Sequence, residues 1–174
     1  MDCTGILLVG GAGQRFGGAK ALASVGEETL GERAWSLLGA CTERIAVGKR
    51  ADGLELPFPL LDDGTEVRAP LAGLVAGLRA AGSEVSVVIP VDMPNLDESD
   101  LLALVAACAD AAVPPSGPLP GAYRRSALPV LERRLAQGRL TLRAALAELE
   151  VRVVPLDPSH LLNVNEPSDL RALT

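Results

Sequence analysis

Short apolar runs alternate with segments of helical periodicity from one end of the chain to the other. The runs at 6–9 and 85–90 are bounded by Gly, Pro or charged residues, which is typical of strands buried on both faces. This alternation predicts one domain over 1–174 with a mostly parallel sheet between two layers of helices, a three-layer α/β/α Rossmann-like sandwich. The predicted strands are 6–9, 44–47, 85–90 and 151–154, and the predicted helices are 29–40, 70–82, 97–109 and 126–138.

Composition agrees with this fold and limits the partners. Of the 174 residues 48% are hydrophobic but only 2% are aromatic, so we expect a core of Leu, Val, Ala and Ile. Single-stranded nucleic acid is normally held by aromatic stacking, and a net charge of −6 repels polyanions and anionic membranes. We therefore expect neither nucleic acid nor a membrane as a partner.

The cysteines indicate the compartment. Cys3, Cys41 and Cys108 form no C-x-x-C pair and lie far apart, which fits a reducing cytoplasm better than a disulfide framework. The sequence also has no charged leader followed by an apolar stretch, and no apolar run of about 18 residues or more. These features predict a cytoplasmic location.

A glycine-rich segment follows the first predicted strand. Residues 9–20 (VGGAGQRFGGAK) contain five glycines together with Arg15 and Lys20. Ligands of open α/β sheets bind outside the carboxyl ends of the strands, which is where this segment is expected. Glycines let successive backbone N–H groups converge on one anion, and the two cations add positive charge. The segment predicts a phosphate-binding loop; the alternative is a flexible solvent loop with ordinary surface cations.

Two familiar phosphate loops do not match this segment. The P-loop pattern G-x-x-x-x-G-K-[ST], begun at Gly13, requires Lys at 19 and Ser or Thr at 20, where the chain has Ala19 and Lys20. The dinucleotide fingerprint G-x-G-x-x-G, begun at Gly11, meets Phe16 at its third glycine. The sequence therefore favours neither a P-loop protein nor a dinucleotide-binding protein.

Polar residues in two further loops could complete a site. Asp92 follows the most apolar predicted strand and lies between Pro90 and Pro94, which would hold it on a stiff turn. Its carboxylate could be a ligand of Mg²⁺, or it could only stop the strand or cap the next helix. Asn163 and Asn165 project to the same side of an extended segment and could bind one ligand together, or Asn165 could cap the final helix.

The motifs together resemble the MobA-like nucleotidyltransferases, the molybdenum cofactor guanylyltransferases of the nucleotide-diphospho-sugar transferase fold. The glycine-rich segment reads G-G-x-x-x-R-x-G-x-x-K, and the turn around Asp92 is similar to the family's P-x-D-x-P. "APLAG" at 69–73 is similar to the family's GPLAG, and "NVNEPSDL" at 163–170 to its carboxyl-terminal motif. The motifs occur in the family's order over nearly the whole chain.

The resemblance implies transfer of GMP from GTP to the terminal phosphate of molybdopterin, with Mg²⁺ or Mn²⁺ as cofactor and transient contacts with other cofactor-biosynthesis proteins or apoenzymes. It implies catalytic roles for Arg15, Lys20 and Asp92, with Asp92 as the metal ligand. The implied acceptor-binding residues are Arg124, Asn163 and Asn165. The implied nucleotide-binding residues are Val9, Gly10, Gly11, Gly13, Lys20, Asp62, Leu71, Ala72 and Gly73.

Two departures from the family pattern keep other functions open. Ala19 stands where many members have an acid directly before the lysine, and the stretch 111–123 is shorter than in the family. One alternative is a cytidylyltransferase of the same fold that acts on the molybdenum cofactor or another small phosphorylated acceptor. The other is a nucleotide-binding regulatory module without catalysis.

Three remaining features are assigned by their context. His160 is the one histidine of the chain and has no His or Cys cluster near it in the sequence, so we expect a surface or helix-cap residue rather than a catalytic base. Ser116 and Ser126 lack the G-x-S-x-G context of nucleophilic serines. The Pro- and Gly-rich stretch 114–121 predicts a loop, which could border a binding cleft.

Overall fold

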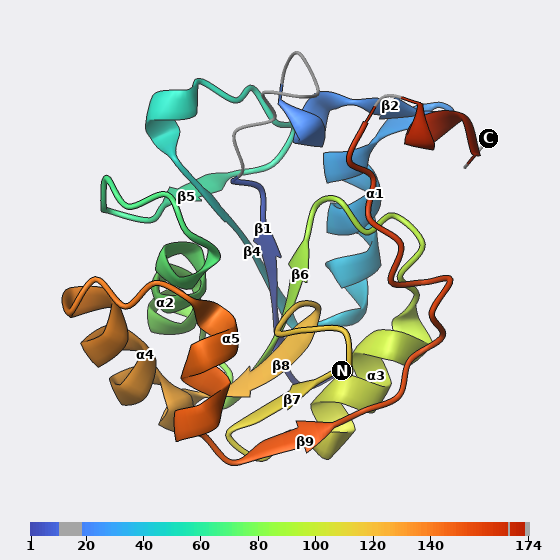
Figure 1. The fold of residues 1–174 in the computed structure, drawn as a ribbon. Coiled ribbons are helices and arrows are strands. Elements are labelled where there is room, and N and C mark those ends of the chain that lie inside the picture. The colour runs from blue at the N-terminus through green and yellow to red at the C-terminus, as the bar shows by residue number, and fades with distance from the viewer. Residues whose placement is uncertain (11–18, 167, 173–174) are drawn as a thin grey trace.

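The computed structural model describes residues 1–10, 19–166 and 168–172, and these form a sheet with helices on both faces (Figure 1). The strands of the main sheet are β1 (Thr4–Leu8), β4 (Glu43–Gly48), β5 (Leu60–Asp62), β6 (Val85–Pro90), β7 (Ala111–Val113), β8 (Gly121–Arg124) and β9 (Val151–Val153), and a small hairpin consists of β2 (Ser24–Val25) and β3 (Glu28–Thr29). The helices are α1 (Leu30–Leu37), α2 (Pro70–Ala80), α3 (Glu98–Ala107), α4 (Leu128–Ala136) and α5 (Leu142–Ala145).

The main sheet of the described chain has seven strands in the order β5-β4-β1-β6-β8-β7-β9. β1 pairs in parallel with both β4 and β6, and β4–β5 and β7–β9 are also parallel pairs. Within this sheet β8 alone runs against its neighbours, β6 and β7. The predicted mostly parallel, three-layer fold is therefore confirmed.

The central strand β1 shows why the sheet is covered on both faces. Successive side chains of a strand point to opposite faces. Leu7 lies in a core cluster with Leu30 of α1 and Leu101 of α3, whereas Ile6 lies in a second cluster with Leu74 of α2. Figure 1 accordingly shows α1 and α3 on one face and α2, α4 and α5 on the other. Burial of each such side chain contributes about 1.5–3 kcal/mol.

Helices α1, α2 and α3 begin at signals that the sequence carries. Thr29 and Glu32 form a capping box at the start of α1, and Asp97 and Asp100 form one at the start of α3. Pro70 occupies the first turn of α2, where its missing N–H costs no hydrogen bond. None of the described helices is sufficiently long and apolar to cross a lipid bilayer.

The sequence analysis did not predict β5, β7 and β8. These strands have three or four residues each, which is too short for alternating hydrophobicity to distinguish a strand from a loop. The order of the four predicted helices and four predicted strands is as expected, although the first turn of the predicted helix 126–138 is a 3-10 turn over Arg125–Ala127.

Candidate active site

Three segments that are distant in the sequence meet where β1 and β6 end. Lys20 begins the 3-10 turn Lys20–Leu22, and its Nζ lies 3.2 Å from Oδ2 of Asp92 and 3.3 Å from Oδ1 of Asn165. The Lys20 and Asp92 side chains are 19% and 25% exposed, so a ligand can reach both. The structure thus brings together three residues that the sequence analysis assigned to a site.

Backbone hydrogen bonds fix the turn that carries Asp92. The N–H of Val91 donates to the carbonyl of Leu8 at 3.2 Å, which keeps the chain beside β1 after β6 has ended. The carbonyl of Asp92 then accepts the N–H of Val164 at 2.8 Å. Asp92 is therefore held between the end of β1 and the carboxyl-terminal segment that carries the two asparagines.

A cavity of about 450 Å³ opens beside the Lys20–Asp92 pair; we call it the first cavity. Its lining includes these two charges and the apolar side chains of Met93, Leu119 and Leu161. The predicted loop after Val113 contributes part of the wall. The complete lining is Leu8, Val9, Gly10, Lys20, Pro70, Pro90, Val91, Asp92, Met93, Ser116, Gly117, Pro118, Leu119, Leu161 and Asn163.

A second cavity of about 280 Å³ adjoins the first, because Leu8, Gly10 and Pro70 line both. It lies at the ends of β4 and β5 and at the start of α2. Its complete lining is Leu8, Gly10, Val47, Gly48, Lys49, Asp52, Asp63, Val67, Arg68, Ala69, Pro70 and Gly73.

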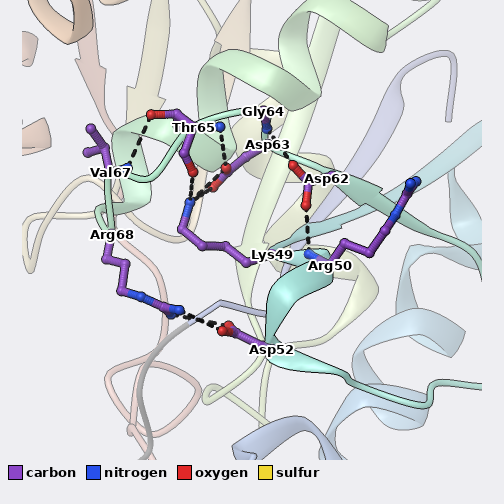
Figure 2. Close-up of polar contacts among 9 residues, drawn as sticks. All are labelled: Lys49, Arg50, Asp52, Asp62, Asp63, Gly64, Thr65, Val67 and Arg68. Carbon is purple, nitrogen blue, oxygen red and sulfur yellow. Dashed lines mark hydrogen bonds and ion pairs between the residues drawn. The ribbon is translucent and has the colours of Figure 1, made fainter.

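A buried ion pair lies on the wall of the second cavity (Figure 2). Nζ of Lys49 lies 2.7 and 2.9 Å from the two carboxylate oxygens of Asp63 and also donates to the carbonyl of Thr65. The two charged side chains are only 10% and 7% exposed. The cavity wall thus has a charged donor and a charged acceptor that are held in place by their pairing with each other.

An exposed ion pair joins two loops that line the same cavity. The guanidinium of Arg68 makes two hydrogen bonds to the Asp52 carboxylate, at 3.2 and 2.7 Å. The hydrogen bond from Arg68 is the main reason that the pKa of Asp52 lies below its ordinary value. Because Arg68 is 55% exposed, water competes for this contact and a ligand can displace it.

Asp62, which the sequence analysis assigned to the nucleotide, points elsewhere. Its carboxylate accepts the backbone N–H groups of Arg50 at 2.7 Å and Gly64 at 2.8 Å, and these bonds hold its pKa below the ordinary value. Neither cavity has Asp62 in its lining, whereas Asp63 lines the second. Neighbouring residues at the end of a strand point in opposite directions, so only one of the two acids can face the cavity.

The other predicted nucleotide-binding residues fall into three groups. Val9 and Gly10 line the first cavity, and Gly10 and Gly73 line the second. Leu71 and Ala72 are 0% and 1% exposed; they pack inside the protein and line neither cavity. The third group, Gly11, Gly13 and the predicted catalytic Arg15, lies outside the described residues.

Arg124, which was predicted to bind the acceptor, is not brought into the site. It pairs with Val85 at the start of β6, whereas Asp92 follows the end of that strand. Its guanidinium donates to the carbonyls of Ala109 at 2.9 Å and Cys108 at 3.1 Å. The cause is the antiparallel direction of β8, which places Arg124 beside the start of β6, at the opposite ends of the strands from Asp92.

Sequence reasoning missed the charged residues of the second cavity. Lys49 and Asp52 belong to "GKRAD" directly after a predicted strand, which was a usable signal because strand ends line ligand sites in α/β sheets. Asp63 directly follows Asp62, which the sequence analysis chose instead. Arg68 had no signal of its own.

The geometry defines a class of protein. A mostly parallel sheet whose strands end at two adjoining cavities, one with a lysine–aspartate pair and one with fixed donors and acceptors, is typical of α/β enzymes that bind a nucleotide beside a second substrate. Residues 5–153 match the family model described as the MobA-like NTP transferase domain, and the chain belongs to this family of nucleotidyltransferases.

Relatives and solved structures agree with the family. The chain is 36% identical to a probable molybdenum cofactor guanylyltransferase of Chloroflexus aggregans, over 98% of this chain and 93% of the relative. It is 34% identical to a protein of the same name from Deinococcus radiodurans, over 100% and 95% of the two chains. The crystal structure of molybdopterin-guanine dinucleotide biosynthesis protein A from Archaeoglobus fulgidus superposes with a TM-score of 0.82, at 26% identity and coverage of 98% and 96%.

Proposed function

We propose that this protein transfers GMP from GTP to the terminal phosphate of molybdopterin and releases pyrophosphate. The observation that carries the proposal is the meeting of Lys20, Asp92 and Asn165 beside the first cavity, which adjoins the second. The names of the relatives, which are molybdenum cofactor guanylyltransferases, support the choice of substrates.

The second cavity would hold the base of the nucleotide. Guanine presents acceptor atoms, O6 and N7, and donor groups on its ring and exocyclic nitrogens. The Asp63 carboxylate can accept from the latter, and the Lys49 ammonium would exchange one of its bonds to Asp63 or Thr65 for a bond to the former. Because both groups are almost fully buried, a base that breaks their pairing without replacing the lost hydrogen bonds is disfavoured.

The triphosphate would then extend toward Lys20. The acceptor phosphate is already an oxyanion and needs no strong base, so the protein's contribution is to position the reactants and to stabilise charge. The ammonium of Lys20 would neutralise the departing pyrophosphate. Gly10 and the segment that follows it would supply backbone N–H groups to the same phosphates.

Asp92 fits the metal ligand that the family implies. It presents a carboxylate on the wall of the first cavity, and hard ions such as Mg²⁺ prefer oxygen ligands and often take only one or two from protein. Bound there, Mg²⁺ or Mn²⁺ would supply positive charge at the reacting phosphate. Lys20, now paired with Asp92, would turn its ammonium to the phosphates of the nucleotide.

The first cavity would hold the acceptor. The flat pterin would pack against Met93, Leu119 and Leu161, while the amide of Asn163 offers both a donor and an acceptor. We place the reaction in the cytoplasm, which the buried free thiols support, and expect transient contact with the proteins that supply or receive the cofactor.

Pyrophosphate release tests the proposal, measured with each of the four nucleoside triphosphates, with Mg²⁺, and with or without molybdopterin. We expect release from GTP that requires the acceptor. Release from CTP instead would identify a cytidylyltransferase. Tight GTP binding without release in the presence of the acceptor would identify a regulatory module.

A further inference from the structure

His160 lies against the buried start of α3. Its Nδ1 is 2.9 Å from Oδ2 of Asp100 and 4.0 Å from Oδ2 of Asp97. The Asp100 side chain is only 5% exposed, and the same Oδ2 accepts the N–H of Asp97 at 3.0 Å. Burial of a carboxylate costs free energy unless the group is paired, and among the described side chains His160 pairs with Asp100, as a cation when its imidazole is protonated.

His160 belongs to a segment, residues 157–165, that we call the strap. The strap contacts the turn between β6 and α3, and the start of α3, at three points. The side-chain amide of Asn95 donates to the carbonyl of Ser159 at 3.1 Å, His160 pairs with Asp100, and the N–H of Val164 donates to the carbonyl of Asp92. Figure 1 shows the chain after β9 passing along α3 toward the edge where β1 ends.

The strap carries the residues by which the carboxyl-terminal part reaches the site. Leu161 and Asn163 line the first cavity, and Asn165 contacts Lys20. The three residues follow His160 at one, three and five positions. His160 is therefore one residue away in the sequence from the wall of this cavity.

We infer that His160 is a positioning residue: by pairing with Asp100 it holds the strap so that Asn163 faces the first cavity and Asn165 faces Lys20. That the ligand of the first cavity is the acceptor rests on the proposed function; the positioning of the strap by His160 does not. Asp97, Asp100 and His160 also lie close enough together to surround a cation, but the cap of α3 and the pairing with His160 already use Oδ2 of Asp100.

The pairing makes the strap sensitive to pH. The acids that face the imidazole are Asp100 and Asp97 at the start of α3 and Asp157 on the strap itself. Desolvation lowers the pKa of His160, but the hydrogen bond to Asp100 and the charges of the three acids outweigh it and raise the pKa above 6.5. The ion pair is lost as the pH rises through this elevated value.

Hydrogen exchange of the ligand-free protein tests the positioning without reference to any reaction. In His160→Ala we expect the amides of the strap, including that of Val164, to exchange about tenfold faster or more, while those of β1 and β6 keep their protection. Leu162→Ala, at a strap residue that is 61% exposed, is the matched control and leaves the exchange unchanged. Unchanged strap exchange in His160→Ala overturns the inference.

Kinetics with GTP and molybdopterin test the consequence. We expect His160→Ala to raise KM for the acceptor about tenfold with KM for GTP nearly unchanged, and His160→Gln, which can still donate a hydrogen bond, to restore part of the loss. In the wild type, KM for the acceptor rises with pH through the pKa of His160, and this dependence is absent from His160→Gln. Equal changes in both KM values indicate a merely structural role. An inactive wild type counts against the proposed function alone, since strap exchange still decides the positioning.

Discussion

The ammonium of Lys20 and the carboxylate of Asp92 lie 3.2 Å apart although 72 positions separate them in the sequence. The contact places the end of the glycine-rich segment and the turn after β6 on one cavity. Without a ligand, each charge neutralises the other. With nucleotide and metal bound, the same two groups would contact the phosphates and the metal.

Removal of either member of this pair should abolish most of the activity. We expect Lys20→Ala and Asp92→Ala each to lower kcat by about a hundred- to a thousandfold, equivalent to about 2.7–4 kcal/mol, as is usual for one preorganised charge-stabilising group. Pyrophosphate release from GTP with molybdopterin measures this. The control is Arg79→Ala, in the last turn of α2. It breaks an exposed ion pair with Glu132 of α4 and should retain activity. Wild-type turnover in both site variants would rule out the proposed mechanism.

The buried pair of the second cavity should contribute to both stability and nucleotide binding. Lys49→Ala leaves the Asp63 carboxylate buried without its cation, and we expect it to lower the free energy of unfolding by about 3–5 kcal/mol. Lys49→Met combined with Asp63→Leu should cost less, because no charge is left unpaired. Urea unfolding measures both, and nucleotide binding should be weakened in both.

The exposed pair of the same cavity provides the matched comparison. Asp52→Ala removes the contact with Arg68, and we expect a loss of stability below about 1 kcal/mol because Arg68 is largely hydrated. A loss of stability as large as that of Lys49→Ala would show that solvent exposure does not determine how much each ion pair contributes to stability.

Arg124 allows the sequence-based assignment to be tested against the structure. Arg124→Ala removes hydrogen bonds to the carbonyls of Cys108 and Ala109, so we expect it to lower stability by about 1–3 kcal/mol. KM for the acceptor should stay unchanged, since the residue lies at the far edge of the sheet. A selective rise of this KM would restore the role that the sequence suggested.

Much of the fold follows from the sequence because periodicity is a local property. Long segments such as 70–82 and 85–90 show their period directly, and the alternation of helices and strands determines the sheet between them. The direction of β8 does not follow from periodicity. For this reason the sequence analysis assigned Arg124 to the acceptor site, whereas the structure places it at the other end of the strands. The choice between Asp62 and Asp63 likewise depends on which side of β5 each residue faces, which spacing alone does not determine.

The site could be predicted in outline because ligand residues follow strand ends in α/β sheets. Lys20 and Asp92 were found in this way, as was Asn165 through its motif. The role of His160 could not be found, because Asp100 lies 60 positions away and only the folded chain brings the two together.

The ion pair of His160 predicts how stability depends on pH. Its pKa is raised in the folded protein, so the stabilisation is fully present below the unfolded value of about 6.5 and is lost as the pH rises through the folded value. We therefore expect the difference in unfolding free energy between the wild type and His160→Gln to shrink as the pH is raised from about 6 to about 9. Urea unfolding across this range measures it, and a difference that grows with pH would contradict the pairing.

The most direct test is a crystal structure of the protein with GTP and Mg²⁺. It should show the guanine in the second cavity against Lys49 and Asp63, the triphosphate against Lys20, and the metal on the carboxylate of Asp92. A triphosphate that touches neither Lys20 nor Asp92 would contradict the account.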